Sequence, residues 1–391
     1  MIQLSRRQML VGLASAAVAP VVAWGAVARI RRVGERDRLI STPFLSGEGG
    51  YQCYRTPGLA ITAQATVLAF CGGRVDNCKD EGNIDLLLRR SEDGGQSWGP
   101  LQVIANDGLN PCKIPLPVVL PTGRILLLWL WNASVRREAD RGRREVRLTL
   151  SDDDGRSWAP SRDITAQARL ADWKPWYGIG PGHGIVKRLE PAAGRIVVPA
   201  RHGLRGRGSA SHLLLSDDGG ASWRVGAVAG FSPSSECAVA ELGDGSLMLN
   251  SRSNGGQRVV SISRDGGLTM ASSGPDPQLI EPQNGCQASL LTYRFDPGQQ
   301  ATLLFSNPVD PIHRTNGRIR VSRNNGRHWS RGFAYGEGPG SFSGYSDLAR
   351  FSNGDVGLLV EAGASHVKAR DNQRHGGIVF QRIPFALIDE A

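Results

Sequence analysis

An eight-residue turn motif recurs five times in this chain and constrains its fold more than any other feature. Its template is S-x-D-x-G-x-[S/T]-W, and successive copies begin 60, 65, 47 and 59 residues apart. The copies occupy residues 91–98, 151–158, 216–223, 263–270 and 322–329, of which the last two are weaker. The aspartate accepts backbone N–H groups within its own turn, the glycine supplies positive φ, and the tryptophan buries a large ring. Each copy therefore predicts a β-hairpin turn, and its aspartate is expected to serve the fold.

The spacing of these turns predicts the architecture. Apolar, strand-like stretches precede most copies, for example residues 84–90 and 146–150. One hairpin in every 47–65 residues indicates one supersecondary unit per copy. That length accommodates four strands of ~5–6 residues with short connections. Four-stranded units repeated radially form a β-propeller. The sequence thus predicts an all-β fold, a six-bladed β-propeller of four-stranded antiparallel blades, in which one blade has lost its turn motif.

The first 28 residues have the pattern of an export signal. Arg6 and Arg7 directly precede an uncharged run over residues 8–28, which ends in the small residues 26–28. A basic start, an apolar middle and a small-x-small end are typical of a cleaved secretory signal, and the paired arginines are typical of a twin-arginine signal. An uncleaved signal anchor is the alternative. We expect a signal over 1–28, one propeller domain over 29–391, and export to the periplasm or the extracellular space, with no membrane association after cleavage.

The composition excludes several other classes of protein. A net charge of +10 over 391 residues is too modest for wholesale disorder, and six cysteines are too few for a disulfide-stapled scaffold of this size. No CxxC or CxxH pattern occurs, so we expect neither a metal nor a cofactor. Cys71 and Cys78 are near enough in sequence to pair across a short loop, although the sequence does not fix the connectivity.

Two arginine-rich runs, residues 136–144 and 201–208, lack interleaved aromatic residues. This pattern favours exposed hairpin tips over a nucleic-acid site. A glycine-rich loop carries His183, which is either a pocket residue or a satisfied structural histidine. Trp173 and Trp176 precede that loop and either stack on a sugar or pack in the core.

A propeller gathers the inner strand ends of distant blades around one axis, so residues far apart in sequence can share a pocket. We therefore searched for charged or aromatic residues in strand-like, otherwise apolar surroundings. The residues selected in this way are Arg55, Arg74, Asp80, Glu236, Arg252, Arg314, Tyr345 and Glu361.

In these segments the chain resembles the exo-α-sialidase (neuraminidase) family, in its bacterial six-bladed form with Asp-box turns. The resemblance extends over about residues 51–388 and does not depend on the turns alone. It is carried, in the expected order relative to the turns, by YRTPG, RVDNCKDEGNIDLLLRRSEDGGQSW, NPCKIPLPVVLPTGRILLLW, GPGHGIVKRLEPAAGRIVVPA, SECAVAELGDGSLMLNSRS, HRTNGRIRVS and YSDLARFSNGDVGLLVE.

The resemblance implies a clamp for the carboxylate of a sialic acid. Arg55, Arg252 and Arg314 match the family's arginine triad, and Glu361 matches the acid that orients Arg55. Arg74 matches an arginine beside the loop of the general acid. Arginine suits this task because its planar fork binds a carboxylate through two parallel hydrogen bonds.

The resemblance also implies the reacting groups. Tyr345 matches the nucleophile and Glu236 the acid paired with it, while Asp80 matches the general acid/base. The loop around Asp80 departs from the family pattern, so Asp76 is the alternative. A neutral tyrosine avoids the repulsion that a carboxylate nucleophile would meet from an anionic sugar, and sialidases are an exception to the two-carboxylate scheme.

The resemblance implies an exported, retaining hydrolase, expected to be a monomer, that removes terminal α-linked sialic acid from glycans or free sialosides. Four alternatives stay open. The first is an enzyme for a deaminated or otherwise modified nonulosonic acid, and the second is transfer of the sugar to another sugar. The third is a propeller without catalysis that binds sialoglycans. The fourth is an unrelated Asp-box propeller that acts on another polysaccharide or serves as a scaffold.

Overall fold

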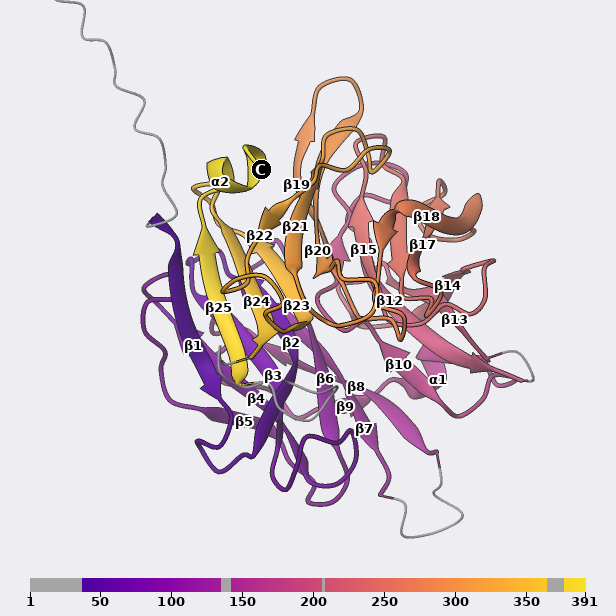
Figure 1. Cartoon of the computed structure of the whole chain (residues 1–391). Coiled ribbons are helices and arrows are strands. Elements are labelled where there is room, and N and C mark those ends of the chain that lie inside the picture. The colour runs from indigo at the N-terminus through magenta and orange to yellow at the C-terminus, as the bar shows by residue number, and fades with distance from the viewer. Residues whose placement is uncertain (1–36, 135–141, 206–207, 364–375) are drawn as a thin grey trace, which may run out of the picture. The chain divides into compact units, whose positions relative to one another are not determined.

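The computed structural model describes residues 37–134, 142–205, 208–363 and 376–391. The predicted export signal over 1–28 lies outside the described residues. The described part is built from six antiparallel sheets that follow one another along the chain, which we call blades I to VI (Figure 1). Neither of the two helices of this part, α1 (Thr165–Ala168) and α2 (Phe385–Asp389), is long and apolar enough to cross a membrane.

Each blade runs from an inner strand, which is first in sequence for blades I to V, to an outer strand. Blade I contains β2 (Cys53–Ile61), β3 (Val67–Arg74), β4 (Ile84–Ser91) and β5 (Gln102–Ala105). Blade II contains β6 (Cys112–Val119), β7 (Ile125–Asn132), β8 (Arg144–Ser151) and β9 (Arg162–Asp163). Blade III contains β10 (Tyr177–Ile179), β11 (Ile185–Val186), β12 (Ile196–Leu204), β13 (Gly208–Ser216) and β14 (Arg224–Val228). Because β10 and β11 both pair with β12, the inner strand of blade III is split by residues 180–184.

Blade IV contains β15 (Cys237–Glu241), β16 (Leu247–Ser251), β17 (Gln257–Ser263) and β18 (Ser272–Ile280). Blade V contains β19 (Ser289–Asp296), β20 (Gln300–Pro308), β21 (Gly317–Ser322) and β22 (Phe333–Ala334). Blade VI contains β23 (Ser343–Arg350), β24 (Val356–Ala362), β25 (Gly377–Ile383) and, as its outer strand, β1 (Leu39–Leu45). In Figure 1 the indigo β1 lies beside the yellow β25, so the ring closes by pairing the first described strand with the last.

The five turn motifs join the third and fourth strands of blades I to V, as the sequence predicts. In the first copy, Asp93 Oδ1 accepts the backbone N–H groups of Gln96 and Ser97, both at 3.0 Å, and the Ser91 hydroxyl at 2.7 Å. Ser91 Oγ in turn accepts the N–H of Gly95 at 2.8 Å, where a φ of 95° requires glycine. The prediction that the sixth blade lost its motif needs correction. Its fourth strand is β1, so blade VI has no connection between third and fourth strands in which the motif could stand.

Buried apolar side chains fill the spaces between blades. Among the described residues they form six clusters, and each cluster joins two neighbouring blades. Between blades II and III, for example, Leu116 and Leu128 pack with Tyr177 and Ile196. Successive side chains of a strand point to opposite faces of its sheet, and in this fold each face meets a neighbouring blade. Both faces therefore carry apolar residues. The inner strands are thereby held around one axis.

A buried polar network at the inner strands ties four blades together. Asp347 of β23 is fully buried, and its Oδ2 accepts the N–H of Leu59 of β2 at 2.8 Å. Its Oδ1 accepts the hydroxyl of Ser289 of β19 at 2.9 Å and lies 2.7 Å from Nδ1 of His183. His183 does not line the cavity described below. Its contacts therefore support a structural role rather than a place in the pocket.

The contact between His183 and Asp347 predicts a pH dependence of stability. Burial opposes protonation of His183, but the Asp347 carboxylate outweighs burial and raises the pKa of the imidazole above its ordinary value. The folded state therefore holds this proton more tightly than the unfolded chain does. The stabilisation that protonated His183 gives the fold is complete below a pH of about 6.5 and is lost as pH rises through the raised pKa. We expect the free energy of unfolding of the parent to exceed that of His183→Gln by more at pH 6 than at pH 9. Urea unfolding at both pH values measures this, and the exposed His328→Gln serves as the control. An equal difference at both pH values would contradict it.

Candidate active site

The inner ends of strands from all six blades surround a cavity of about 350 Å³. Seven of the eight residues selected from the sequence line it, namely Arg55, Arg74, Asp80, Glu236, Arg252, Arg314 and Tyr345. The eighth, Glu361, is fully buried next to Arg55. Asp76, the alternative to Asp80, is exposed and does not line the cavity. The turn aspartates are likewise absent from the lining, as expected of residues that serve the fold.

Irregular strand ends aim the key side chains into this cavity. The register of β2 against β3 shifts between Arg55 and Gly58, and Thr56 has a φ of 59°, which is rare for a β-branched residue. The register of β23 against β24 shifts in the same way around Tyr345. Such bulges redirect a side chain out of the alternation of the strand. They explain why Arg55 and Tyr345 leave the sheet face and enter the cavity.

Glu361 of β24 holds the backbone on both sides of this arrangement. Its Oε1 accepts the N–H of Thr56 at 2.8 Å and lies 3.5 Å from Arg55 Nε, while its Oε2 accepts the N–H of Tyr345 at 3.2 Å. Burial lowers the pKa of the Arg55 guanidinium, but the charges of Glu361 and Asp80 outweigh burial and raise it. One carboxylate thus fixes both the strand of Arg55 and the strand of Tyr345.

Tyr345 and Glu236 form the central contact of the site. The Tyr345 hydroxyl donates to Oε1 of Glu236, and both side chains are buried. Arg252 Nη1 lies 2.9 Å from Glu236 Oε2 and 3.5 Å from the Tyr345 hydroxyl. The guanidinium carbons of Arg55 and Arg314 lie 5.6 and 5.4 Å from the centre of the Tyr345 ring. The three arginines of the predicted triad therefore lie close to one tyrosine, Arg252 to its hydroxyl and Arg55 and Arg314 to its ring, and the hydroxyl is in contact with a carboxylate.

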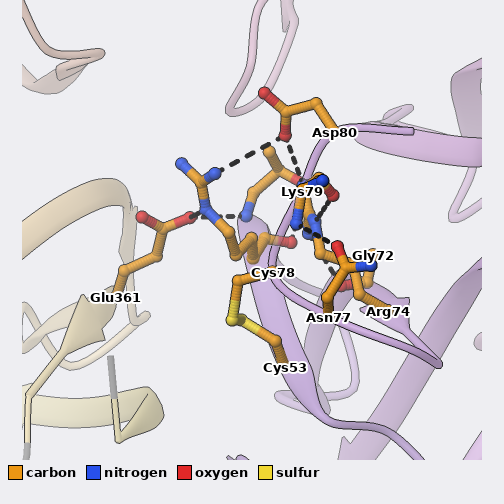
Figure 2. Close-up of a disulfide and its surroundings, with 10 residues drawn as sticks. Cys53, Gly72, Arg74, Asn77, Cys78, Lys79, Asp80 and Glu361 are labelled. Atoms are coloured by element: carbon orange, nitrogen blue, oxygen red, sulfur yellow. Dashed lines mark hydrogen bonds and ion pairs between the residues drawn. A yellow bond between two sulfur atoms is a disulfide. The ribbon is translucent and has the colours of Figure 1, made fainter. Parts of the chain in front are cut away.

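Asp80 lies at the mouth of the cavity on the loop between β3 and β4. Its Oδ1 is 2.9 Å from Arg74 Nη2 and 3.5 Å from Arg55 Nη1, yet its side chain remains 71% exposed (Figure 2). Desolvation raises the pKa of the Asp80 carboxyl, but the charges of Arg55, Arg74 and Lys113 outweigh it and hold that pKa well below its usual range. In the unliganded site Asp80 is therefore an ionised counter-anion to these cations.

A disulfide joins Cys53 and Cys78, so the suggested pairing of Cys71 with Cys78 is wrong. Cys71 is a buried free thiol inside β3, on a strand that pairs along both edges and points its side chain into the core. The bridge ties the Asp80 loop to β2, two residues before Arg55 on one side and two residues before Asp80 on the other (Figure 2). It links the strand of Arg55 covalently to the loop of Asp80.

Removing this bridge with a Cys53→Ser/Cys78→Ser double variant is expected to cost stability and activity together. A closed loop of about 25 residues corresponds to about 3 kcal/mol of stability, and the freed loop would hold Asp80 less closely to Arg55 and Arg74. The measurements are the free energy of unfolding and kcat/KM below the unfolding transition. A Cys112→Ser variant, which alters a buried cysteine that forms no disulfide, controls for the replacement of a cysteine by serine. Unchanged stability and unchanged kcat/KM in the double variant would contradict this role.

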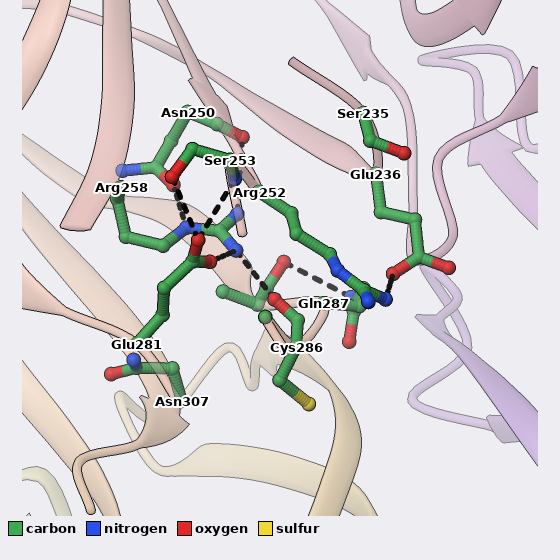
Figure 3. Close-up of polar contacts among 12 residues, drawn as sticks. Ser235, Glu236, Asn250, Arg252, Ser253, Arg258, Glu281, Cys286, Gln287 and Asn307 are labelled. Atoms are coloured by element: carbon green, nitrogen blue, oxygen red, sulfur yellow. Dashed lines mark hydrogen bonds and ion pairs between the residues drawn. The ribbon is translucent and has the colours of Figure 1, made fainter. Parts of the chain in front are cut away.

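Behind Arg252 lies a buried ion pair between Arg258 and Glu281, both with 0% of the side chain exposed, at 3.0 Å (Figure 3). Glu281 Oε1 accepts the N–H groups of Ser253 and Asn254 at 2.8 and 2.9 Å, and so holds the segment that directly follows Arg252. Arg258 also donates to the backbone carbonyl of Cys286. The carbonyl of the preceding residue, Gly285, accepts a hydrogen bond from Arg314 Nη2 at 3.1 Å. The pair therefore supports the backbone around two arginines of the triad.

The cavity also contains three cations that sequence reasoning missed. They are Lys113 of β6 and Arg144 of β8 in blade II and Arg201 of β12 in blade III, and Trp176, which precedes β10, lines the cavity with them. Arg144 and Arg201 belong to the two runs that we expected to be exposed hairpin tips, and that expectation is wrong for both residues. Arg144 begins β8 and Arg201 lies within β12, and both side chains line the cavity. Residues 136–141 and 206–207 of these runs lie outside the described residues. Trp173 does not line the cavity but stacks on His202.

A signal for Lys113 was present in the sequence. Arg55-Thr56-Pro57 and Lys113-Ile114-Pro115 have the same cation-x-Pro pattern at the same place in consecutive blades. Ile114 has a φ of 57°, close to that of Thr56, and the register of β6 also shifts here. Burial lowers the pKa of Lys113 to about 7, and burial together with the charge of Arg201 lowers that of Arg144 to about 10. Among the described residues no three His, Cys, Asp or Glu side chains gather as a metal site.

Comparisons with known proteins agree with this geometry. Residues 66–358 match the family model described as a BNR repeat-like domain. The chain is 31% identical over 368 residues to a sialidase of Micromonospora viridifaciens, covering 89% of this chain and 55% of that protein. It is 30% identical over 346 residues to an exo-alpha-sialidase of Aspergillus fumigatus, covering 80% of this chain and 79% of that protein.

Among solved structures, a Hadza microbial sialidase matches with a TM-score of 0.75 and 27% identity over 90% of this chain and 69% of that chain. A leech intramolecular trans-sialidase matches in fold, with a TM-score of 0.76 and 18% identity over 90% of this chain and 71% of that chain. The chain spans little more than half of the Micromonospora protein and 62% of a Bacteroides fragilis sialidase. From the family match, the relatives and the six-bladed fold it follows that this chain is a member of the sialidase family with BNR repeats.

Proposed function

We propose that this protein is an exported, retaining exo-α-sialidase, which hydrolyses terminal α-linked sialic acid with Tyr345 as its nucleophile. The observation that carries the proposal is the contact of the Tyr345 hydroxyl with Glu236 inside a ring of arginines. A tyrosine is a weak nucleophile at its ordinary pKa of about 10, and an adjacent base is the usual means of activating it. A site that only bound glycans would need the arginines but no such pair.

The arginine triad supports recognition of a sugar that carries its carboxylate on the anomeric carbon. Arg55 and Arg314 lie near the Tyr345 ring and Arg252 near its hydroxyl, and all line one cavity, so a carboxylate bound among the three arginines would bring the anomeric carbon close to the hydroxyl oxygen. Bound in this way, the reacting atoms need little further positioning, which is a large part of enzymatic rate enhancement.

The reaction balances over two steps. In the first, the Tyr345 oxygen forms a bond to the anomeric carbon and gives its proton to Glu236, while the bond to the leaving oxygen breaks and Asp80 protonates that oxygen. In the second, water attacks the anomeric carbon and gives a proton to Asp80, while the tyrosine–sugar bond breaks and Tyr345 recovers its proton from Glu236. Two displacements at one carbon retain the configuration.

The surroundings of Asp80 support its role as the acid, because its pKa depends on the positive charge of the arginines that a substrate would partly neutralise. In the unliganded site Arg55 and Arg74 keep Asp80 ionised. A substrate carboxylate that enters the triad neutralises part of this positive charge, and the pKa of the Asp80 carboxyl then rises toward the range in which it donates a proton. Substrate binding would thus generate the acid that the first step needs. Export and charge complete the proposal, because the signal pattern is that of a chain directed out of the cytoplasm. Cleavage after residue 28 would remove Arg6 and Arg7 and lower the net charge from +10 to +8, which still attracts anionic glycans.

The test is turnover of a fluorogenic α-ketoside of N-acetylneuraminic acid and of its C5-hydroxyl counterpart, with the first-formed anomer identified by NMR. We expect release of the fluorophore from at least one of them and the α anomer as the first product. A folded protein that cleaves neither α-ketoside would overturn the proposal. Formation of the β anomer first would overturn the double-displacement mechanism while leaving hydrolysis intact.

A further inference from the structure

The loop between β3 and β4, which carries Asp80, is held to blade I by several contacts. Arg74 Nε donates to the carbonyl of Lys79 at 2.9 Å, and the disulfide of Cys78 with Cys53 ties the same loop to β2 (Figure 2). The carboxylate of Asp80 is itself largely exposed, so packing does not fix its direction. The position of the backbone at Asp80 therefore decides where this carboxylate stands.

Lys113 of β6 holds the same loop from blade II. Its ammonium group donates to the backbone carbonyl of Asp80, across the boundary between the two blades. The side-chain amide of Asn132 on β7 can turn its oxygen to the same ammonium group, at 3.2 Å. The loop of the proposed acid is thus attached to two blades rather than to one.

The cations that reach Asp80 from β2 and from β6 occupy equivalent places in their blades. Arg55 and Lys113 each stand two residues before a proline, and each is followed by a residue with positive φ, at 59° and 57°. At this point the register of each inner strand shifts against the next strand of its blade. Arg55 Nη1 lies 3.5 Å from the carboxylate of Asp80, whereas Lys113 binds its carbonyl. The same bulge in consecutive blades therefore supplies one cation for the side chain of the acid and one for its main chain.

Lys113 stands where a positive charge is costly. Its side chain is buried, and burial lowers the pKa of its ammonium group to about 7, although the carboxylate of Asp80 opposes this shift. The other charged groups around it are the cations Arg144, Arg74 and Arg201, which also disfavour its charge. Packing alone does not call for a cation here, and residues that break the ordinary rules of burial tend to lie at functional sites.

We propose that Lys113 is a positioning residue for the proposed reaction, which holds the carbonyl of Asp80 so that the carboxyl group of Asp80 reaches the leaving oxygen. The inference rests on the proposed function and concerns the proton that Asp80 transfers. Lys113 acts through Asp80 and forms no bond to the sugar. Its loss would therefore weaken protonation of the leaving group and leave the attack by Tyr345 intact.

Two α-ketosides of the same sialic acid, with different leaving groups, isolate this role. A nitrophenol leaves readily without a proton, whereas an alkyl alcohol needs one, so the alkyl ketoside depends far more on a well-placed acid. The measured quantity is the ratio of kcat/KM for the alkyl ketoside to that for the nitrophenyl ketoside. We expect Lys113→Met to lower this ratio about tenfold, which is part of the ~10²–10⁴-fold that general acid catalysis typically contributes.

Loss of the positive charge alone would act in the opposite direction. The cations around Asp80, which are Arg55, Arg74 and Lys113, outweigh its burial and lower the pKa of its carboxyl group. Without Lys113 that carboxyl group would keep its proton to a higher pH, and more of the acid form would be present. A lower ratio in Lys113→Met therefore reports the position of Asp80 and not its charge.

Arg144→Met is the matched control, because it removes a cation of the same cavity that donates to the carbonyl of Tyr177 instead. Its ratio should equal that of the parent, even where both rates fall. Lys113→Arg keeps a charged donor and should recover part of the ratio. In an Asp80→Asn background, where the acid is already absent, Lys113→Met should not lower the ratio further.

Methionine matches the length of the lysine stem, and replacing a buried charge by an apolar side chain is generally tolerated, so the variant is expected to fold. A thermal melt checks this. A folded Lys113→Met variant with the ratio of the parent would overturn the inference and leave the proposed function standing. An equal rise of KM for both ketosides at unchanged kcat would also overturn it, because Lys113 would then be a substrate contact.

A ratio in Lys113→Arg no higher than in Lys113→Met would likewise overturn the role of the donated hydrogen bond. Failure of the folded parent on both ketosides would contradict the proposed function itself.

Discussion

A Tyr345→Phe variant is expected to keep its fold and lose about a thousandfold or more of kcat/KM, which corresponds to about 4 kcal/mol of transition-state stabilisation. The hydroxyl oxygen is the only atom removed, and it is the atom that would bond to the anomeric carbon. The ring remains to pack beside Arg55 and Arg314, so the cavity keeps its shape. The measurement is steady-state turnover of the better α-ketoside, together with a thermal melt.

The matched control is Tyr293→Phe. That hydroxyl donates to the carbonyl of Gly354 at 2.8 Å, between blades V and VI and outside the cavity lining. It should lose a little stability and no activity, because the same atom is removed far from the chemistry. Full activity in a folded Tyr345→Phe variant would show that another group attacks the sugar.

The second large effect is expected at the buried ion pair. Arg258→Met leaves the buried Glu281 without its cation, and breaking such a pair typically costs about 3–5 kcal/mol. The double variant Arg258→Met/Glu281→Met removes both charges and should recover much of that loss. Urea unfolding of the parent, both single variants and the double variant closes a double-mutant cycle.

Activity is expected to fall along with stability in the single variant, because Glu281 holds the backbone after Arg252. Arg124→Met breaks the exposed pair of Arg124 with Asp152 and should change little, which controls for the loss of an arginine. If Arg258→Met were as stable as Arg124→Met, the pair would not support the site.

The blade number and the turns could be predicted from the sequence because both depend on local rules. An aspartate, a glycine and a tryptophan at fixed spacing specify a hairpin without reference to the rest of the chain. The outer strand of the sixth blade could not be found in this way. Residues 39–45 carry no motif that names their partner, and β25 lies more than 330 residues further on. Such a pairing is decided by the closure of the ring.

The site residues likewise fall into those that a local sequence pattern predicts and those that depend on the tertiary fold. Arg55, Tyr345 and Glu236 lie in segments with a family resemblance, and the structure brings them into one cavity. Arg144 and Arg201 were misjudged because each lies in a run of arginines that resembles a surface segment, and only the strand to which each belongs, β8 or β12, brings it to the cavity. The disulfide partner of Cys78 was equally hidden. Cys53 is farther away in sequence than Cys71, but antiparallel pairing of β2 with β3 brings it beside the Asp80 loop.

The completion of blade VI by β1 has a consequence for the order in which the molecule is made. β1 is among the first strands to leave the ribosome, and its partner β25 is among the last. Until β25 arrives, β1 is an unpaired edge, and β24, which carries Glu361 and flanks the strand of Tyr345, lacks its outer neighbour. Tyr345, the proposed nucleophile, is therefore among the last groups of the described part to be fixed, and a chain that ends before residue 377 would leave both β1 and β24 without the strand that pairs with them. Synthesis from one end to the other thus delays the appearance of activity until the ring is whole.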